Sequence, residues 1–198
     1  MRRIAICGID GSGKTTLTQA LMSIFQEWNI SCLYAHVPFD SKQILDAVEI
    51  NKDFEEFEIT KRIGMAFDFV RYYKEVFNNY DIMLCDRYDI DFKVLNDVYH
   101  LPNKYIHILN DIYQQVPKAD LYIYLKTTVS TAENRLNSRG NRQKDESTEI
   151  LDSMYRSFEN QLQQCDNYIV IDGEESIDTI ISDVTKQICI FLKESKND

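Results

Sequence analysis

The feature that most constrains the fold of this chain is a glycine-rich loop at residues 8–15, directly after a short apolar run. The loop spells Gly-Ile-Asp-Gly-Ser-Gly-Lys-Thr and fills every fixed position of the pattern G-x-x-x-x-G-K-[ST]. Its glycines let backbone N–H groups turn inward around a phosphate, in conformations that a side chain would forbid. A helical pattern follows, and the positive N-terminal end of such a helix would point at the same phosphate. The sequence therefore predicts a nucleoside-triphosphate site.

The individual loop residues have different expected tasks. Lys14 supplies a mobile positive charge for the β- and γ-phosphates, and Thr15 supplies a hydroxyl for Mg²⁺. The full set expected to bind ATP from this segment is Gly8, Asp10, Gly11, Ser12, Gly13, Lys14, Thr15 and Thr16.

This loop alone is shared by kinases, switch GTPases and motor ATPases. A switch GTPase needs Asn-Lys-x-Asp to recognise guanine, but the segment 51–54 is Asn-Lys-Asp-Phe and comes before the third predicted strand. Motor ATPases usually have a larger core than 198 residues provide. A small kinase is the class that these observations favour.

Apolar periodicity predicts five strands that alternate with helices. The strands are expected at 2–7, 31–37, 81–85, 121–125 and 168–171. The helices are expected at 14–28, 53–79 with a break near Gly64, 92–116 with an interruption near Pro102, 127–139, 149–165 and 177–193. This order predicts an α/β fold: a five-stranded parallel sheet with helices on both faces, in one domain over 1–198. Ligands of such sheets bind beyond the carboxyl ends of the strands.

Composition excludes several classes of protein. The formal net charge of −10 argues against binding of a nucleic-acid polymer, which needs a basic face. The five cysteines are odd in number and lack Cys-x-x-Cys spacing, so neither a disulfide framework nor a zinc site is expected, and Cys7 and Cys85 should be buried core residues. No apolar stretch approaches ~18 residues, so no membrane span is expected. Without a signal-peptide pattern, the expected compartment is the cytoplasm.

Residues for a second substrate follow the third predicted strand. Asp86 can hold Mg²⁺ directly or through water, and Arg87 can clamp a second phosphate with two hydrogen bonds, although a structural ion pair is the simpler alternative. Phe67 and Arg71 are four residues apart on one face of the long helix. They could stack on a base and bond its edge, and the alternative is a core phenylalanine with a solvated arginine.

A polar segment at 140–147 mixes basic and acidic residues and predicts a mobile loop. Three arginines belong to this region. The predicted helix at 127–139 contains Arg135 and Arg139, and Arg142 follows just after it. Arginines there could close over a transferred phosphoryl group and offset its charge. The alternative is an ordinary solvated helix end, where cations favour the negative end of the dipole.

These pieces together resemble the thymidylate kinases, the nucleoside monophosphate kinases that phosphorylate dTMP. The resemblance runs nearly end to end and is strongest at 8–16 and in Asp-Arg-Tyr at 86–88. Supporting parts are the Phe67 and Arg71 pair, Pro-Lys-Ala-Asp at 117–120, the arginine-bearing lid at about 139–147, and Ile-Asp-Gly at 171–173.

The resemblance implies an activity and a set of roles. The activity is ATP- and Mg²⁺-dependent transfer of a γ-phosphoryl group to a nucleoside monophosphate, with dTMP giving dTDP. Lys14 and Asp86 would take part in catalysis, Asp10 would meet the acceptor's 3′-hydroxyl, and Arg87 would hold its phosphate. Phe67 would stack on the base and Arg71 would bond its edge. The resemblance also implies a homodimer.

The remaining implied roles belong to the donor and the lid. The segment of Asp172, Gly173 and Glu174 would border the donor adenine, and Arg135 would help to bind the donor. Because Gly11 follows Asp10 where another subgroup of the family has arginine, the lid should supply the catalytic arginine, from Arg139 or Arg142.

Departures from the family pattern concentrate in the acceptor half. Where the family has Arg-Glu-Pro after the second strand, this chain has His-Val-Pro at 36–38, and Lys126 replaces an acid at the end of the fourth strand. Phe92 and Leu95 stand where asparagine and tyrosine would approach the base. Loss of buried polar partners weakens discrimination for a base. A kinase of an unphosphorylated deoxynucleoside or another nucleotide-like acceptor, and a non-catalytic ATP-binding regulator, therefore stay open as alternatives.

Overall fold

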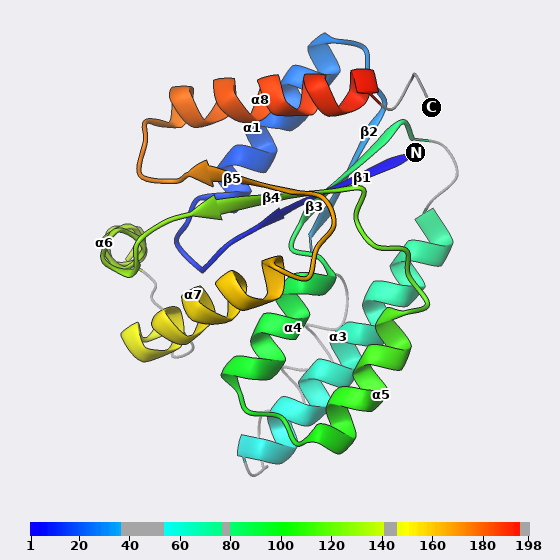
Figure 1. Ribbon diagram of the computed structural model, residues 1–198, viewed down its shortest axis with the longest axis vertical. Helices are drawn as coiled ribbons and strands as arrows, with labels where there is room; N and C mark the ends of the chain where they lie inside the picture. Colours follow the sequence, from blue (N-terminus) through cyan, green and yellow to red (C-terminus); the bar gives the residue numbers. More distant parts are fainter. Residues whose placement is uncertain (37–53, 77–79, 141–145, 195–198) are drawn as a thin grey trace.

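Five parallel strands form one sheet in the order β2-β3-β1-β4-β5 (Figure 1). The computed structural model describes residues 1–36, 54–76, 80–140 and 146–194. The strands are β1 (Arg2–Cys7), β2 (Cys32–His36), β3 (Ile82–Asp86), β4 (Leu121–Lys126) and β5 (Tyr168–Asp172). The predicted α/β fold with a five-stranded parallel sheet is confirmed.

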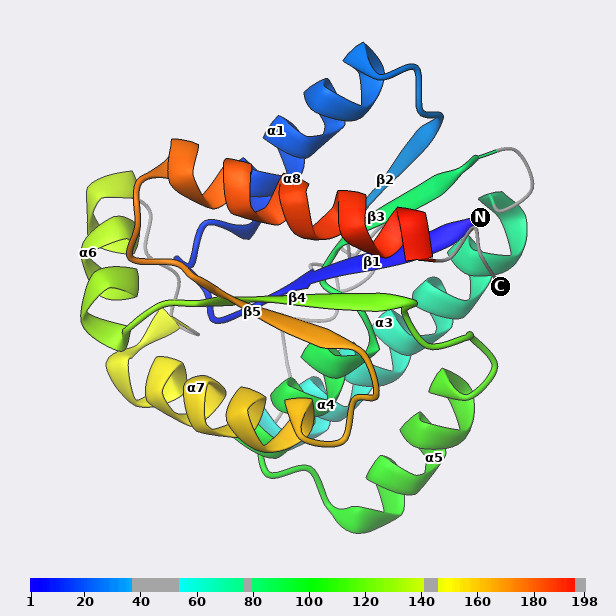
Figure 2. The ribbon, with the colours of Figure 1, turned by 45° about the horizontal axis from the view of Figure 1, so that its top comes forward.

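Helices cover both faces of this sheet (Figures 1 and 2). One face carries α1 (Lys14–Glu27) and α8 (Ile177–Glu194). The other carries α3 (Phe54–Val76), α4 (Asp89–Val98), α5 (Asn103–Tyr113) and α7 (Thr148–Leu162). A further helix, α6 (Val129–Arg139), lies beyond the carboxyl ends of β4 and β5.

The central strand β1 contributes side chains to the hydrophobic cores on both faces of the sheet. Ile4 and Ile6 pack into the core shared with α1 and α8, while Ala5 and Cys7 pack into the core on the other face. Successive side chains of a strand point to opposite faces, so a strand that is covered on both sides is apolar throughout. Cys7 and Cys85 are buried as predicted, and all five cysteines are free.

Two predicted helices differ from those observed. The long helix α3 continues through Gly64 without the predicted break. The segment 92–116 divides at Pro102 as predicted, but α4 begins earlier, at Asp89. This start brings α4 directly to the end of β3.

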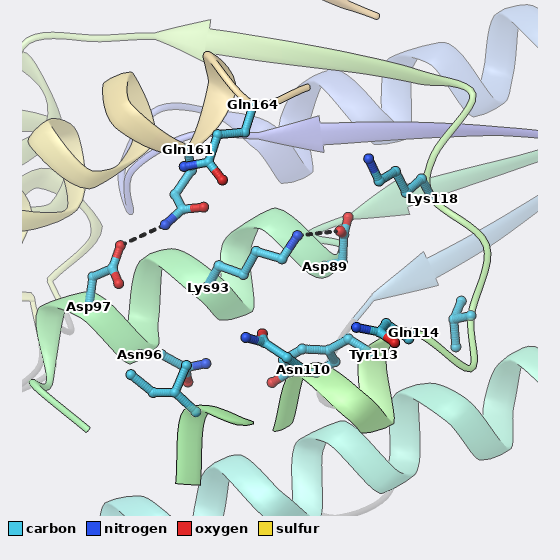
Figure 3. A pocket seen from close by; sticks show the side chains of 12 residues that line it. Asp89, Lys93, Asn96, Asp97, Asn110, Tyr113, Gln114, Lys118, Gln161 and Gln164 are labelled. Atoms are coloured by element: carbon cyan, nitrogen blue, oxygen red, sulfur yellow. Dashed lines mark hydrogen bonds and ion pairs between the residues drawn. The ribbon is translucent and has the colours of Figure 1, made fainter. Parts of the chain in front are cut away.

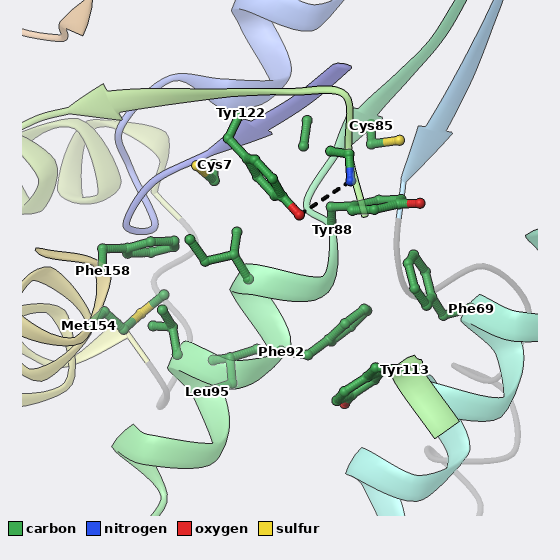
Figure 4. Close-up of a cluster of buried hydrophobic side chains, with 14 of the residues drawn as sticks. Cys7, Phe69, Cys85, Tyr88, Phe92, Leu95, Tyr113, Tyr122, Met154 and Phe158 are labelled. Atoms are coloured by element: carbon green, nitrogen blue, oxygen red, sulfur yellow. Dashed lines mark hydrogen bonds between the residues drawn. The ribbon is translucent and has the colours of Figure 1, made fainter. Parts of the chain in front are cut away.

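Aromatic rings fill the core between α3, α4 and α5 (Figure 4). Phe92 is 0% exposed and stacks on Tyr113, with ring centroids 5.2 Å apart, and Phe69 packs edge-on against both rings. Leu95 is buried in the same cluster. The expectation that Phe92 and Leu95 approach a bound base is therefore wrong, because both are core residues.

Candidate active site

Strand register brings the candidate site together at the carboxyl edge of the sheet. The glycine loop leaves the end of β1, and Asp86 at the end of β3 pairs in register with Ile6 of β1 and with His36 of β2. Chain order reverses around β1, and ligands of open parallel sheets bind at such a point.

The loop has the backbone conformation that its glycines predict. Gly8, Gly11 and Gly13 have φ values of 151°, 81° and 100°. Lys14 Nζ donates hydrogen bonds to the carbonyl oxygens of Gly8 and Ile9, at 2.8 and 2.9 Å. The ammonium group is thus held across the loop at the start of α1, while Thr15 and Thr16 are exposed beside it.

Helix α6 packs directly on the loop at Gly11. A Cβ atom at this position would lie 2.6 Å from the backbone oxygen of Ala132 and 3.0 Å from Leu136 Cγ. Arg135 fixes the same contact, because its guanidinium donates to the Ser12 carbonyl at 3.1 Å and to the Gly173 carbonyl at 2.8 Å. The predicted donor residue Arg135 therefore connects the loop, α6 and the segment after β5.

The predicted metal residues are in contact. Thr15 Oγ1 donates to Asp86 Oδ2 at 2.6 Å, and His36 Nδ1 lies 3.3 Å from the same oxygen. Burial raises the pKa of Asp86, but the hydrogen bond from His36 and the charge of Lys14 outweigh it and lower the pKa to about 2. The carboxyl group is therefore ionised at neutral pH.

This pair fits a Mg²⁺ ion. Asp86 Oδ1 is buried and has no hydrogen-bond partner among the described residues, and a hydroxyl lies beside the carboxylate. Within that part of the chain, no three His, Cys, Asp or Glu residues form a metal-binding group. Mg²⁺ is commonly held by one or two protein oxygens together with substrate phosphates and water, so two protein groups suffice.

Arg87, which was predicted to bind the acceptor phosphate, contacts Asp10 of the phosphate loop. Its φ of 77° lies in the left-handed region, which is uncommon for a residue with a side chain and is found often at functional sites. Its guanidinium donates to Asp10 Oδ1 at 2.5 Å, and Lys14 Nζ lies 3.6 Å from the same oxygen. Burial raises the pKa of Asp10, but the positive charges of Arg87 and Lys14 outweigh it and lower the pKa overall.

Of the three predicted lid arginines, the structure describes two. Arg139, the last residue of α6, donates to Glu146 Oε1 at 2.6 Å. Its positive charge also contributes to the lowered pKa of Asp10. Arg142 lies outside the described residues.

The other predicted residues lie around this centre. Phe67 is 60% exposed on α3, so the alternative of a core phenylalanine is wrong, and Arg71 is exposed one turn later. Asp172 is exposed at the end of β5 and accepts a hydrogen bond from the backbone N–H of Glu174. The backbone N–H of Gly173 donates to the Lys126 carbonyl at 2.7 Å.

Two residues of this region, His36 and Glu146, were not among the predicted site residues, whereas Glu174 belongs to the predicted segment at 172–174. His36 contacts Asp86, Glu146 binds Arg139, and Glu174 accepts hydrogen bonds from Thr128 and Thr131 at the start of α6. His36 is the last residue of β2, and the carboxyl end of a strand is where ligand-binding residues are expected. Nothing in the local sequence distinguishes the buried Glu146 from a glutamate on the surface.

A separate cavity of about 430 Å³ lies between α4, α5 and the end of α7 (Figure 3). Lys93 and Asn96 of α4, Tyr113 of α5 and Gln161 of α7 are among its lining residues. None of the residues predicted for the site lines this cavity.

The fold and the phosphate loop define a protein of the P-loop class, which binds nucleoside triphosphates, and its match to a kinase family makes it a phosphotransferase. The family model described as thymidylate kinase matches residues 6–184. The chain belongs to the thymidylate kinase family, which confirms the resemblance and implies ATP as the nucleotide substrate. Among the described residues, no helix is long and apolar enough to cross a membrane.

Individual relatives are distant. A probable thymidylate kinase of Sulfurisphaera tokodaii is 23% identical over 193 residues, which are 97% of this chain and 98% of the relative. Two structures of a deoxyadenosine kinase from M. mycoides, one with the products dCMP and a flexible dCDP and one with dATP, have TM-scores of 0.72 and 0.70. They are 21% and 22% identical and cover 94% of this chain and 98% of their own, so they support the fold.

Proposed function

We propose that the protein transfers the γ-phosphoryl group of ATP, with Mg²⁺, to the phosphate of a nucleoside monophosphate, and that dTMP is the acceptor. The observation that carries this proposal is Arg87, a residue with left-handed backbone whose guanidinium lies against Asp10 in the phosphate loop. A guanidinium beside a triphosphate loop is suited to a second phosphate, because it can form two parallel hydrogen bonds with phosphate oxygens.

Charge neutralisation is the main task of the loop residues in this proposal. Lys14 binds the β- and γ-phosphates, and Thr15 and Asp86 hold the Mg²⁺ ion. When bound, Mg²⁺ supplies further positive charge to the phosphate oxygens. The protein contributes position and charge, and no covalent enzyme intermediate is needed.

The pKa values near the loop support a phosphorylated acceptor over a free deoxynucleoside. A phosphate oxygen is a nucleophile at neutral pH, whereas a sugar hydroxyl needs a general base to take its proton. The pKa of Asp86 is about 2, and the pKa of Asp10 is also below its usual value. A carboxylate whose pKa is lowered is a weaker base than usual, so these two are poorly suited to activate a hydroxyl.

Packing at Gly11 supports a catalytic arginine from the lid. A side chain at this position would collide with the backbone of α6, so the loop has no room for an arginine there. Helix α6 packs on the loop and ends at Arg139, and the positive charge of Arg139 helps to lower the pKa of Asp10. We propose Arg139 and Arg142 as the residues that stabilise the transferred phosphoryl group.

Further parts of the proposal rest on the family resemblance. Phe67 stacks on the acceptor base and Arg71 bonds its edge, Asp10 meets the acceptor sugar, and Asp172 and Gly173 border the adenine. A single domain with a lid at about 139–147, a homodimer and a cytoplasmic location also stay predictions.

The experiment is ADP release with Mg·ATP over a panel of dTMP, other nucleoside monophosphates, thymidine and deoxycytidine. We expect turnover with dTMP, and we expect Arg87→Ala to remove most of it by weakening acceptor binding, with little change in KM for ATP. Arg156→Ala is the matched control, because Arg156 forms an exposed ion pair with Asp152 on α7. Turnover with thymidine that survives Arg87→Ala would instead show a deoxynucleoside kinase. ATP binding without acceptor-dependent ADP release would show a non-catalytic protein.

A further inference from the structure

A buried carboxylate connects α7 to the end of α6. Glu146 is 5% exposed, and its Oε1 accepts a hydrogen bond from Arg139 Nη2 at 2.6 Å. The Arg139 side chain is 51% exposed, so only part of its guanidinium faces the protein. A guanidinium has five N–H donors in a planar fork, so it can bind a carboxylate and a phosphate group at the same time.

Glu146 is held in place by the start of α7. Its neighbour Ser147 caps this helix, accepting a hydrogen bond from the backbone N–H of Ile150 at 3.4 Å. Leu151 and Met154, in the first two turns, are buried in the core that α7 shares with α4. The carboxylate is therefore attached to a fixed part of the fold.

Helix α6, which ends at Arg139, contacts the phosphate loop at Gly11. Arg135 and Arg139 are four residues apart on α6, so they lie on the same face of the helix. Arg135 contacts the Ser12 carbonyl of the loop, and the charge of Arg139 acts on Asp10 of the same loop. Arg139 is thus bound by Glu146 at the end of the helix that packs on the loop.

We propose that Glu146 is a positioning residue, which holds the Arg139 guanidinium toward the phosphates that react in the loop. This inference rests on the proposed function. An arginine side chain has many rotamers, and fixing one of them in advance removes part of the entropic cost of reaching the transition state.

The opposite role would be a latch that must open before catalysis. Burial of Glu146 argues against a latch, because separation of the pair would leave a charged carboxylate in the protein interior without its partner. The two roles predict opposite effects on turnover. A positioning residue raises kcat, so its removal lowers kcat, whereas removal of a latch raises it.

The test compares kcat and KM for Glu146→Ala, Glu146→Gln and the wild type. We expect Glu146→Ala to lower kcat about 10- to 100-fold, the range for a catalytic group displaced by about 1 Å, with KM for ATP nearly unchanged. Glu146→Gln keeps a hydrogen-bond acceptor and should restore part of kcat. Asp152→Ala is the control, since it removes an exposed carboxylate from an ion pair on the same helix.

A double-variant cycle separates positioning from a general structural effect. In the Arg139→Ala background, Glu146→Ala should lower kcat no further, because the group that it positions is already absent. An unchanged or raised kcat in Glu146→Ala, or an equal loss with and without Arg139, would overturn the proposal.

A second readout does not depend on turnover. In ¹H–¹⁵N spectra of the arginine side chains, the Arg139 guanidinium should give restricted Nη signals in the wild type and averaged signals in Glu146→Ala. If the wild type shows these restricted signals but no acceptor-dependent ADP release, the proposed function fails while the contact holds. If the signals are averaged in both proteins, the positioning role fails.

Discussion

Asp86 and Asp91 lie five residues apart around the end of β3, and their pKa values move in opposite directions. Asp86 has polar and charged neighbours in His36, Lys14 and Thr15, which lower its pKa to about 2. Asp91 is fully buried, and its burial raises the pKa to about 7, against the charge of Lys14 and the hydrogen bond from the Tyr88 N–H. One carboxyl is thus suited to bind a cation, and the other titrates near neutral pH.

The titration of Asp91 predicts how stability depends on pH. Because the folded protein binds this proton more tightly than the unfolded chain, the stabilisation is complete below pH 4 and is lost as the pH rises toward 7. We expect Asp91 to lower the free energy of unfolding by at most about 1.4 kcal/mol per pH unit in this window. Asp91→Asn should remove that contribution while keeping an acceptor for the Tyr88 N–H.

Urea unfolding at pH 5 and pH 7 checks this prediction, with Asp152→Asn as a control for an exposed carboxyl. The loss of stability between the two pH values should be clearly smaller in Asp91→Asn than in the wild type and the control. Equal losses in all three proteins would contradict a raised pKa at Asp91.

At the scale of elements, the contact between α6 and the phosphate loop organises the donor site. Ala132 and Leu136 approach Gly11 closely, and Arg135 binds the loop carbonyl of Ser12. The same helix ends at Arg139, where Glu146 binds it. Helix α6 therefore both contacts the phosphate loop and carries Arg135 and Arg139.

Gly11→Ala tests this contact. The new Cβ would lie 2.6 Å from the Ala132 oxygen, at a φ of 81°. We expect a loss of about 1–2 kcal/mol of stability from the left-handed backbone and roughly 1–3 kcal/mol more from the collision. ATP affinity should fall as well, because the loop must shift.

Gly140→Ala is the matched control for Gly11→Ala, since Gly140 has a φ of 80° but no atom of the described residues within 4 Å of its added Cβ. It should show only the backbone cost and an unchanged ATP affinity. Thermal unfolding and ATP titration measure both quantities. Similar ATP affinities for the two variants would show that α6 does not constrain the loop.

Local patterns in the sequence predicted the elements well, but not the contacts between them. The strands and the glycine loop follow from short-range signals, and all five strands lie within a residue or two of their predicted bounds. The predicted break at Gly64 failed because packing of α3 outweighs the roughly 1 kcal/mol that a glycine costs inside a helix.

The candidate site shows the same division. The contact of Thr15 with Asp86 was predictable, since adjacent parallel strands end at the same edge of the sheet. Phe92 was assigned to the acceptor site because a sequence does not distinguish a ring in the core from a ring at a ligand. The bond of Arg139 to Glu146 depends on how α7 packs, and no local pattern encodes that.

At the scale of the whole molecule, a net charge of −10 coexists with a site for polyanionic substrates. Lys14, Arg87 and Arg139 all act on Asp10, so positive charge is concentrated around the loop although the chain as a whole is acidic. The sheet makes this concentration possible, because it brings residues from distant parts of the sequence to one edge.

The most direct test of transfer to a nucleoside monophosphate is ³¹P NMR of a reaction with Mg·ATP and dTMP. Phosphoryl transfer to the acceptor phosphate converts dTMP to dTDP and ATP to ADP. The monophosphate signal of dTMP therefore disappears together with the γ-signal of ATP, and coupled diphosphate signals of both products grow without release of inorganic phosphate. We predict these signals with the wild type and their absence with Lys14→Ala. A monophosphate signal from thymidine in place of a diphosphate signal from dTMP, or loss of ATP to inorganic phosphate alone, would contradict it.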